Sequence, residues 1–179
     1  MELGNEYLNI VRGRFENVKT LGDKTISQLS EPDLHWTLNN SSNSIAVIIK
    51  HLSGNMISRW TDLFTSDGEK TFRNRDREFE EDHSSRQKLL EFWENGWGIL
   101  LETMDNLDST DLLKTVTIRG ENHTVVEAIE RQMAHYAYHV GQMVYIGKQV
   151  KGDEWKTLSI PKGRSDEYLQ QKLNKHGRK

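Results

Sequence analysis

The chain has 179 residues, enough for one domain with a sizeable core, and its 24 Lys and Arg against 27 Asp and Glu give a net charge of −3. Phosphate binding usually needs a basic surplus, so nucleic acid is not expected as a partner. The absence of cysteine excludes a disulfide, a zinc–thiolate site and a cysteine nucleophile. No apolar run approaches the ~20 residues that cross a bilayer, and the start MELGNEYLNI is too polar for a signal peptide. We therefore expect a cytoplasmic protein without a membrane partner.

The chain contains only two prolines, Pro32 and Pro161, so long helices are expected. Ser41 to Ser44 offer N-caps for one helix, and Thr124 opens another. The segment KTVTIRGENH alternates and contains a turn signal, which predicts a short extended excursion. Residues 66–83 are too charged for a core element and are interpreted as a long connection, able to span up to ~60 Å if extended. Apolar periodicity predicts four helices, over about 2–29, 44–64, 84–107 and 124–150.

These elements predict an all-α fold, a four-helix bundle with a long crossover between the second and third helices. Such a crossover makes the second and third helices parallel, and the second and fourth antiparallel. We expect the bundle domain to occupy residues 1–160, with the chain near Trp155 to Ile160 packed against it. Residues 161–179 are interpreted as a basic, flexible tail.

The pair His135 and His139 carries the main indication of chemistry. Residues four apart in a helix leave the same face, roughly 6 Å from each other, and two neutral imidazoles so placed can bind one divalent metal ion. His51, in the second helix, is the candidate for a third ligand. At about 1.5 Å per residue, antiparallel packing of the second and fourth helices brings His51 to the same depth as the pair.

The alternative is that these are ordinary surface or core histidines, because an H-x-x-x-H pair often arises by chance. The other histidines lie in predicted loops, caps or the tail and are expected to be solvated: His35, His83, His123 and His176. The charged run RNRDREFEED is interpreted as a solvated connection, from which Arg73, Arg75 or Arg77 could reach an anionic substrate.

Two segments, AVIIKHLSGNMISRW and AHYAYHVGQMVYIGK, resemble the DinB/YfiT-like superfamily. The segments FTSDGEKTFRNRDREFE and LSIPKGRSDEY are similar to a Bacillus-type branch of unknown function. The resemblance implies a four-helix bundle with crossover topology, often a homodimer. It also implies a divalent metal ion, commonly nickel or zinc, held by His51, His135 and His139. Some relatives are thiol transferases or isomerases that use low-molecular-weight thiols such as bacillithiol, mycothiol or glutathione.

Two functions follow. The first is a metal-dependent thiol S-transferase, in which a bound metal ion lowers the pKa of a bacillithiol-type cosubstrate, within a pocket made polar by Ser44, Asn55 and Gln142. Its catalytic residues are not assigned, because no general base is evident in the sequence, although Gln142 could orient a bound group. The second is a non-catalytic metal- or ligand-binding bundle with a role in stress.

Overall fold

The computed structural model describes residues 2–177, and these are mostly helical, in agreement with the predicted all-α class. No helix in this range has the length and the apolar character that a membrane span requires. The four long helices are α1 (Glu2–Ile26), α3 (Ile45–Trp60), α5 (Arg86–Asn106) and α6 (Val125–Lys151). The shorter elements are α2 (Glu31–Leu34), α4 (Arg75–Glu78), strands β1 (Thr115–Ile118) and β2 (Glu121–Thr124), the 3-10 turn η1 (Gly152–Glu154) and α7 (Ser165–His176).

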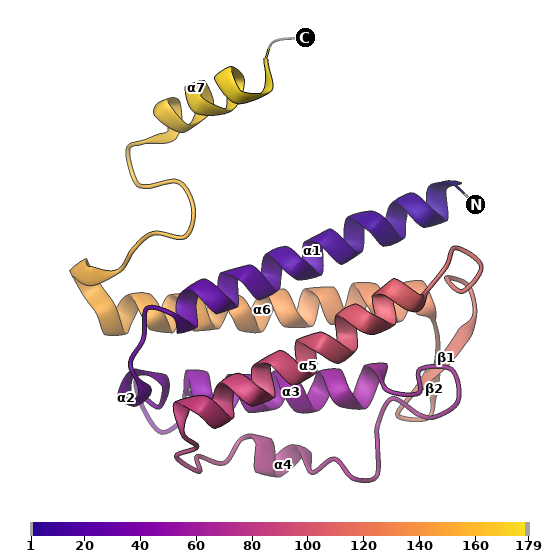
Figure 1. Cartoon of the computed structure of the whole chain (residues 1–179). Coiled ribbons are helices and arrows are strands. Elements are labelled where there is room, and N and C mark those ends of the chain that lie inside the picture. Colours follow the sequence, from indigo (N-terminus) through magenta and orange to yellow (C-terminus); the bar gives the residue numbers. More distant parts are fainter. Residues whose placement is uncertain (1, 178–179) are drawn as a thin grey trace.

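The long helices pack in pairs, α3 against α5 and α1 against α6. Figure 1 shows α3 and α5 running in one direction, and α1 and α6 in the opposite direction. Residues 61–85 leave the end of α3 and return along its length to the start of α5, carrying α4 on the way (Figure 1). The charged connection therefore lies beside α3, and α4 contacts that helix.

Aromatic side chains fill the centre of the core. Trp93 and Trp97 are fully buried on α5, with ring centroids 5.5 Å apart. Trp97 in turn lies edge-on to Tyr136 of α6, whose ring also faces Phe15 of α1. Trp60 is buried as well, so three of the five tryptophans are used inside this chain. The number of tryptophans is therefore no indication of a subunit interface.

The starts of α3 and α6 are where the sequence predicts them. The hydroxyl of Ser44 accepts a hydrogen bond from the backbone N–H of Val47 at 3.1 Å, and Thr124 forms a capping box with Glu127. The predicted end of α3 near Phe64 is wrong. The helix ends at Trp60, because Asp62 takes a positive φ of 50°, which a right-handed helix cannot contain.

The extended segment before α6 is a β-hairpin with a two-residue turn. Its turn residues Arg119 and Gly120 both have positive φ, as a type I′ turn requires, and Gly supplies one of them without strain. Both turn N–H groups donate to the carboxylate of Asp67, at 2.8 Å each, and Gly68 donates to the carbonyl of Thr117. The hairpin is thereby fixed to the start of the connection between α3 and α5.

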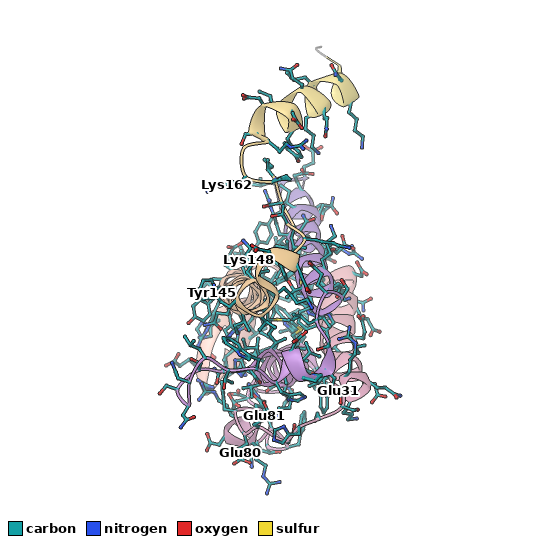
Figure 2. All side chains as sticks on the ribbon, turned by 90° about the vertical axis from the view of Figure 1, so that its left-hand side faces the viewer. Glu31, Glu80, Glu81, Tyr145, Lys148 and Lys162 are labelled. Atoms are coloured by element: carbon teal, nitrogen blue, oxygen red, sulfur yellow. The ribbon has the colours of Figure 1, made fainter. Side chains whose placement is uncertain are left out.

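The end of the chain contains a helix that the sequence analysis missed, α7. Figure 2 shows it beyond Lys162, apart from the long helices, of which α6 carries the labelled Tyr145 and Lys148. Before it, the ring of Trp155 packs where Gly147 leaves room, as expected, but Ile160, at the other end of the segment expected to pack, is 40% exposed. The expected flexibility of residues 161–179 stays a prediction, and residues 178 and 179 lie outside the described range.

We expect Gly96→Ala to destabilise the protein by about 1–3 kcal/mol, because a Cβ at Gly96 would lie 2.8 Å from the Cα of Ser53, where α5 meets α3. Gly98→Ala is the matched control on the same helix. A Cβ at Gly98 meets nothing within 4 Å, so the better helix former should stabilise by up to ~1 kcal/mol. Denaturant unfolding of both variants measures the difference, and shifts of the same sign would contradict this account of the α3–α5 contact.

Candidate metal centre

Three imidazoles meet where α3 faces α6. His51 comes from α3 and is 4% exposed, while His135 and His139 are one turn apart on α6 and half-buried. The ring centroids lie 4.7–5.2 Å from one another. Each ring offers one ligand nitrogen, and these three atoms lie within 4.8 Å of each other. The structure thus brings together the three histidines that the sequence singled out.

The spacing of the ring nitrogens suits a metal ion. The Nε2 atoms of His51 and His135 are 3.1 Å apart. Two nitrogens that each bind zinc at 2.0–2.1 Å in tetrahedral geometry would be about 3.3 Å apart. Two lone pairs at this distance repel each other unless a proton or a cation lies between them. The three imidazole nitrogens could therefore hold a metal ion between them.

A carboxylate and an arginine hold His51 in place. Nδ1 of His51 lies 3.0 Å from Oε2 of Glu78, at the end of α4, which leaves Nε2 to face the other histidines. The guanidinium of Arg73 donates to both oxygens of Glu78, at 2.7 and 2.8 Å. Burial opposes the ionisation of Glu78, but the hydrogen bonds from Arg73 and His51 outweigh it and keep its pKa below the usual value. A carboxylate on the far nitrogen of a histidine is the usual support for a metal ligand.

Gly54 makes this support possible. It lies on α3, three residues after His51, and a Cβ there would be 2.2 Å from Oε1 of Glu78. The missing side chain leaves the slot through which the carboxylate reaches the helix. Any larger residue at position 54 would displace Glu78 from His51.

The two histidines of α6 are kept neutral. Burial, followed by the neighbouring charges of His139 and His51, lowers the pKa of His135 to about 3. Burial also lowers the pKa of His139, whose Nδ1 lies 2.9 Å from Oε1 of Gln142. Because neither ring is protonated near neutral pH, a metal ion would not have to compete with a proton there.

A cavity of about 310 Å³ opens beside the three rings. Its polar floor is fixed by a buried chain of hydrogen bonds, in which Trp60 Nε1 donates to the hydroxyl of Tyr136 and this hydroxyl donates to Oδ1 of Asn55, each at 3.0 Å. Burial raises the pKa of Tyr136, so its hydroxyl stays protonated. Within the described residues, no Asp or Glu lines this cavity.

Of the three polar residues expected around the pocket, only Asn55 lines it. The expectation for Ser44 is wrong, because its hydroxyl caps α3 and donates to Glu81 on the connection. Gln142 acts indirectly, through His139. Arg73 is wrong as a substrate contact, since its side chain is 2% exposed and is committed to Glu78. Arg75 does line the cavity.

The expectation that His35 is solvated is also wrong. Its side chain is 12% exposed, and its two ring nitrogens face Oε1 of Glu81 at 2.8 Å and the carbonyl of Ser84 at 3.0 Å. Glu81 and His83 complete a second group with the spacing of metal ligands. His35 is, however, already engaged with Glu81 and with the carbonyl of Ser84, and a metal ion would have to replace these contacts. The side chain of His176 lies outside the described residues.

The sequence analysis missed Glu78 and gave Arg73 a different role from the one it has here, which is to hold that carboxylate. They lie in a charged run without periodicity, and only the return of the connection along α3 brings them to His51. A detectable signal was Gly54, a glycine inside a strongly apolar helix, which often marks a close approach by another group.

Residues 2–164 match a family described as "Protein of unknown function (DUF1572)". Because this match covers most of the chain, the protein belongs to that family. No curated protein matches the chain. The family description states no activity, so the function has to be argued from the site.

We expect Glu78→Gln to weaken the binding of nickel or zinc by about 10–100-fold, the usual effect of losing a supporting carboxylate. Gly54→Ala should weaken binding in the same way, by displacing the carboxylate. Glu80→Gln, an exposed neighbour on the same connection, is the matched control. Metal titration followed by calorimetry measures all three, and equal affinities for Glu78→Gln and Glu80→Gln would show that the carboxylate does not support a metal ligand.

Proposed function

We propose that His51, His135 and His139 bind one divalent first-row metal ion, nickel or zinc, within a DinB-like four-helix bundle with a crossover connection. The observation that carries this proposal is the 3.1 Å approach of two imidazole nitrogens, with a third ring beside them and a carboxylate behind the first. The parallel course of α3 and α5, with the connection returning along α3 from the end of one helix to the start of the other, supports the assignment of the bundle (Figure 1).

The reaction we propose is transfer of a low-molecular-weight thiol of the bacillithiol type to an electrophile. A metal ion bound here would lower the pKa of that thiol. The chain has no cysteine of its own, so the sulfur must come from the cosubstrate. Glu78 and Gln142 hold two of the imidazoles in orientation, while Asn55 presents a fixed amide at the cavity floor. A cytoplasmic location, where such thiols stay reduced, is part of the proposal.

The second candidate is a non-catalytic metal- or ligand-binding protein. It is favoured by the lack of a free carboxylate for proton transfer, because within residues 2–177 no carboxylate lines the cavity, and Glu78, behind His51, is held by Arg73 and His51. A thiol transferase needs no protein base if a metal ion would lower the pKa of the thiol enough for its proton to pass to water; the thiolate sulfur would then bond to carbon as a halide leaves or an epoxide C–O bond opens. The two candidates therefore differ in turnover and agree in metal content.

Metal analysis tests the site itself. We expect the purified protein to bind one nickel or zinc ion per chain, and His135→Ala to lose most of it while keeping its helical content. His83→Asn is the matched control, because it removes an exposed imidazole elsewhere and asparagine tolerates the positive φ of that residue. Full metal stoichiometry in His135→Ala would show that the three histidines do not bind the metal ion.

Activity separates the two candidates. We expect metal-loaded protein to consume bacillithiol in the presence of a generic electrophile such as a haloalkane or an epoxide, and His139→Ala to lose this rate. An unchanged rate in His139→Ala would exclude the metal site from the mechanism. One metal ion per chain without turnover would favour the binding protein.

We also propose a homodimer, which rests on the resemblance to DinB-like proteins. Sedimentation velocity at micromolar concentration measures the mass of the particle. We expect twice the mass of the 20.8 kDa chain, and a monomer mass would refute the dimer without affecting the metal site.

A further inference from the structure

The cavity beside the three histidines is lined by four arginines. Arg59 comes from α3, Arg75 from α4, Arg119 from the hairpin turn and Arg131 from α6. They belong to four separate elements, so no single segment of the sequence predicts that they lie together. With no acidic residue on the described part of the wall, the cavity is positively charged, in a protein whose net charge is −3.

Two of these arginines are partly neutralised from behind. Arg59 is buried and donates to the carbonyl of Gly68 and to the carboxylate of Glu69 at 3.2 Å. Arg119 donates to the same carboxylate at 2.8 Å. Glu69 thus serves the guanidinium groups of Arg59 and Arg119 and also lies 3.8 Å from that of Arg73, so it does not neutralise both cavity arginines.

The other two arginines have no acidic partner among residues 2–177. Both are exposed, so they lie on the solvent side of the cavity. The guanidinium of Arg75 is held over the ring of Phe79, 5.4 Å from its centroid, and that ring lies 4.7 Å from the ring of His51. Arg75 is therefore placed at the edge of the candidate metal centre without being used in an ion pair.

A buried amide adds a further polar contact. Gln132 lines the cavity, is 3% exposed, and its Oε1 has no hydrogen-bond partner in the described structure. An unpartnered buried amide is costly, and nearly all such groups are completed by water or a ligand. Because this oxygen can only accept, a donor would satisfy it, such as a water molecule or a hydroxyl or amine group of the bound molecule.

We propose that this cavity binds a small organic anion with at least two negative charges, carried as carboxylate or phosphate. Its acidic groups contact Arg75 and Arg131 at the entrance, and its reacting end faces His51, His135 and His139. The volume of about 310 Å³ is at the lower end of the range for ligand sites, which limits the anion to a small molecule. This assignment of the substrate class rests on the proposed function, but the anion site can be tested alone.

The test is calorimetric titration of metal-free protein, at low salt and neutral pH, with succinate and inorganic phosphate as probes. Removing the metal first ensures that the anion does not bind to the ion instead. We expect at least one probe to bind, and high salt to weaken its binding. Preference for succinate assigns carboxylate groups to the natural ligand, and preference for phosphate assigns phosphate groups.

The variants localise the binding. We expect Arg75→Gln and Arg131→Gln each to raise the Kd of the probe about tenfold, the effect of losing one charged hydrogen bond. Arg77→Gln, two residues from Arg75 but facing another cavity, and Arg14→Gln, an exposed arginine of α1, remove the same charge and should change the Kd by no more than about twofold. Circular dichroism confirms that all four variants are folded.

Two results would overturn the proposal: no binding of either probe to the unaltered protein, or equal weakening in the control and the cavity variants. Nickel titration of the same proteins tests the metal site independently of anion binding. We expect Arg75→Gln and Arg131→Gln to bind nickel as the unaltered protein does. Loss of nickel binding in the unaltered protein would refute the metal site and leave the anion result standing.

Discussion

The approach of two imidazole nitrogens to 3.1 Å in a half-buried place is the constraint on which the rest of the structure depends. At this distance the two nitrogens need a proton or a cation between them, and both rings must be held in place. Burial keeps His135 neutral, and Glu78 fixes His51. Glu78 itself needs Arg73, because an unpaired buried carboxylate would be costly. The return of the connection along α3 is the arrangement that brings this pair of charges to the histidines.

Much of the helical framework could be predicted because it follows from local rules. The caps at Ser44 and Thr124 and the turn at Gly120 are set by residues close in sequence. The convergence of the histidines needed one further step, the antiparallel course of two helices, after which equal depth followed from the rise per residue. Metal binding itself stays a prediction, since geometry alone does not show an ion.

The surroundings of the site could not be predicted, because they depend on where an irregular segment lies. Arg73 and Arg75 are two residues apart in one charged run, yet the first is buried against Glu78 and the second lines the cavity. No periodicity distinguishes them. The sequence likewise places His35 in a loop. Only the fold brings the carboxylate of Glu81 and the carbonyl of Ser84 to its ring nitrogens.

The contact between the hairpin turn and Asp67 has a consequence for how such proteins can diverge. Two irregular segments, the connection and the hairpin, are joined to each other there, and together they supply Arg75 and Arg119 to the cavity. The histidines and the aromatic core come from the long helices instead. A change in the length of either loop would therefore move Arg75 and Arg119 together and alter the wall of the cavity. The histidines would stay in place. Members of the family with the same helices and different loops should select different molecules with one common centre.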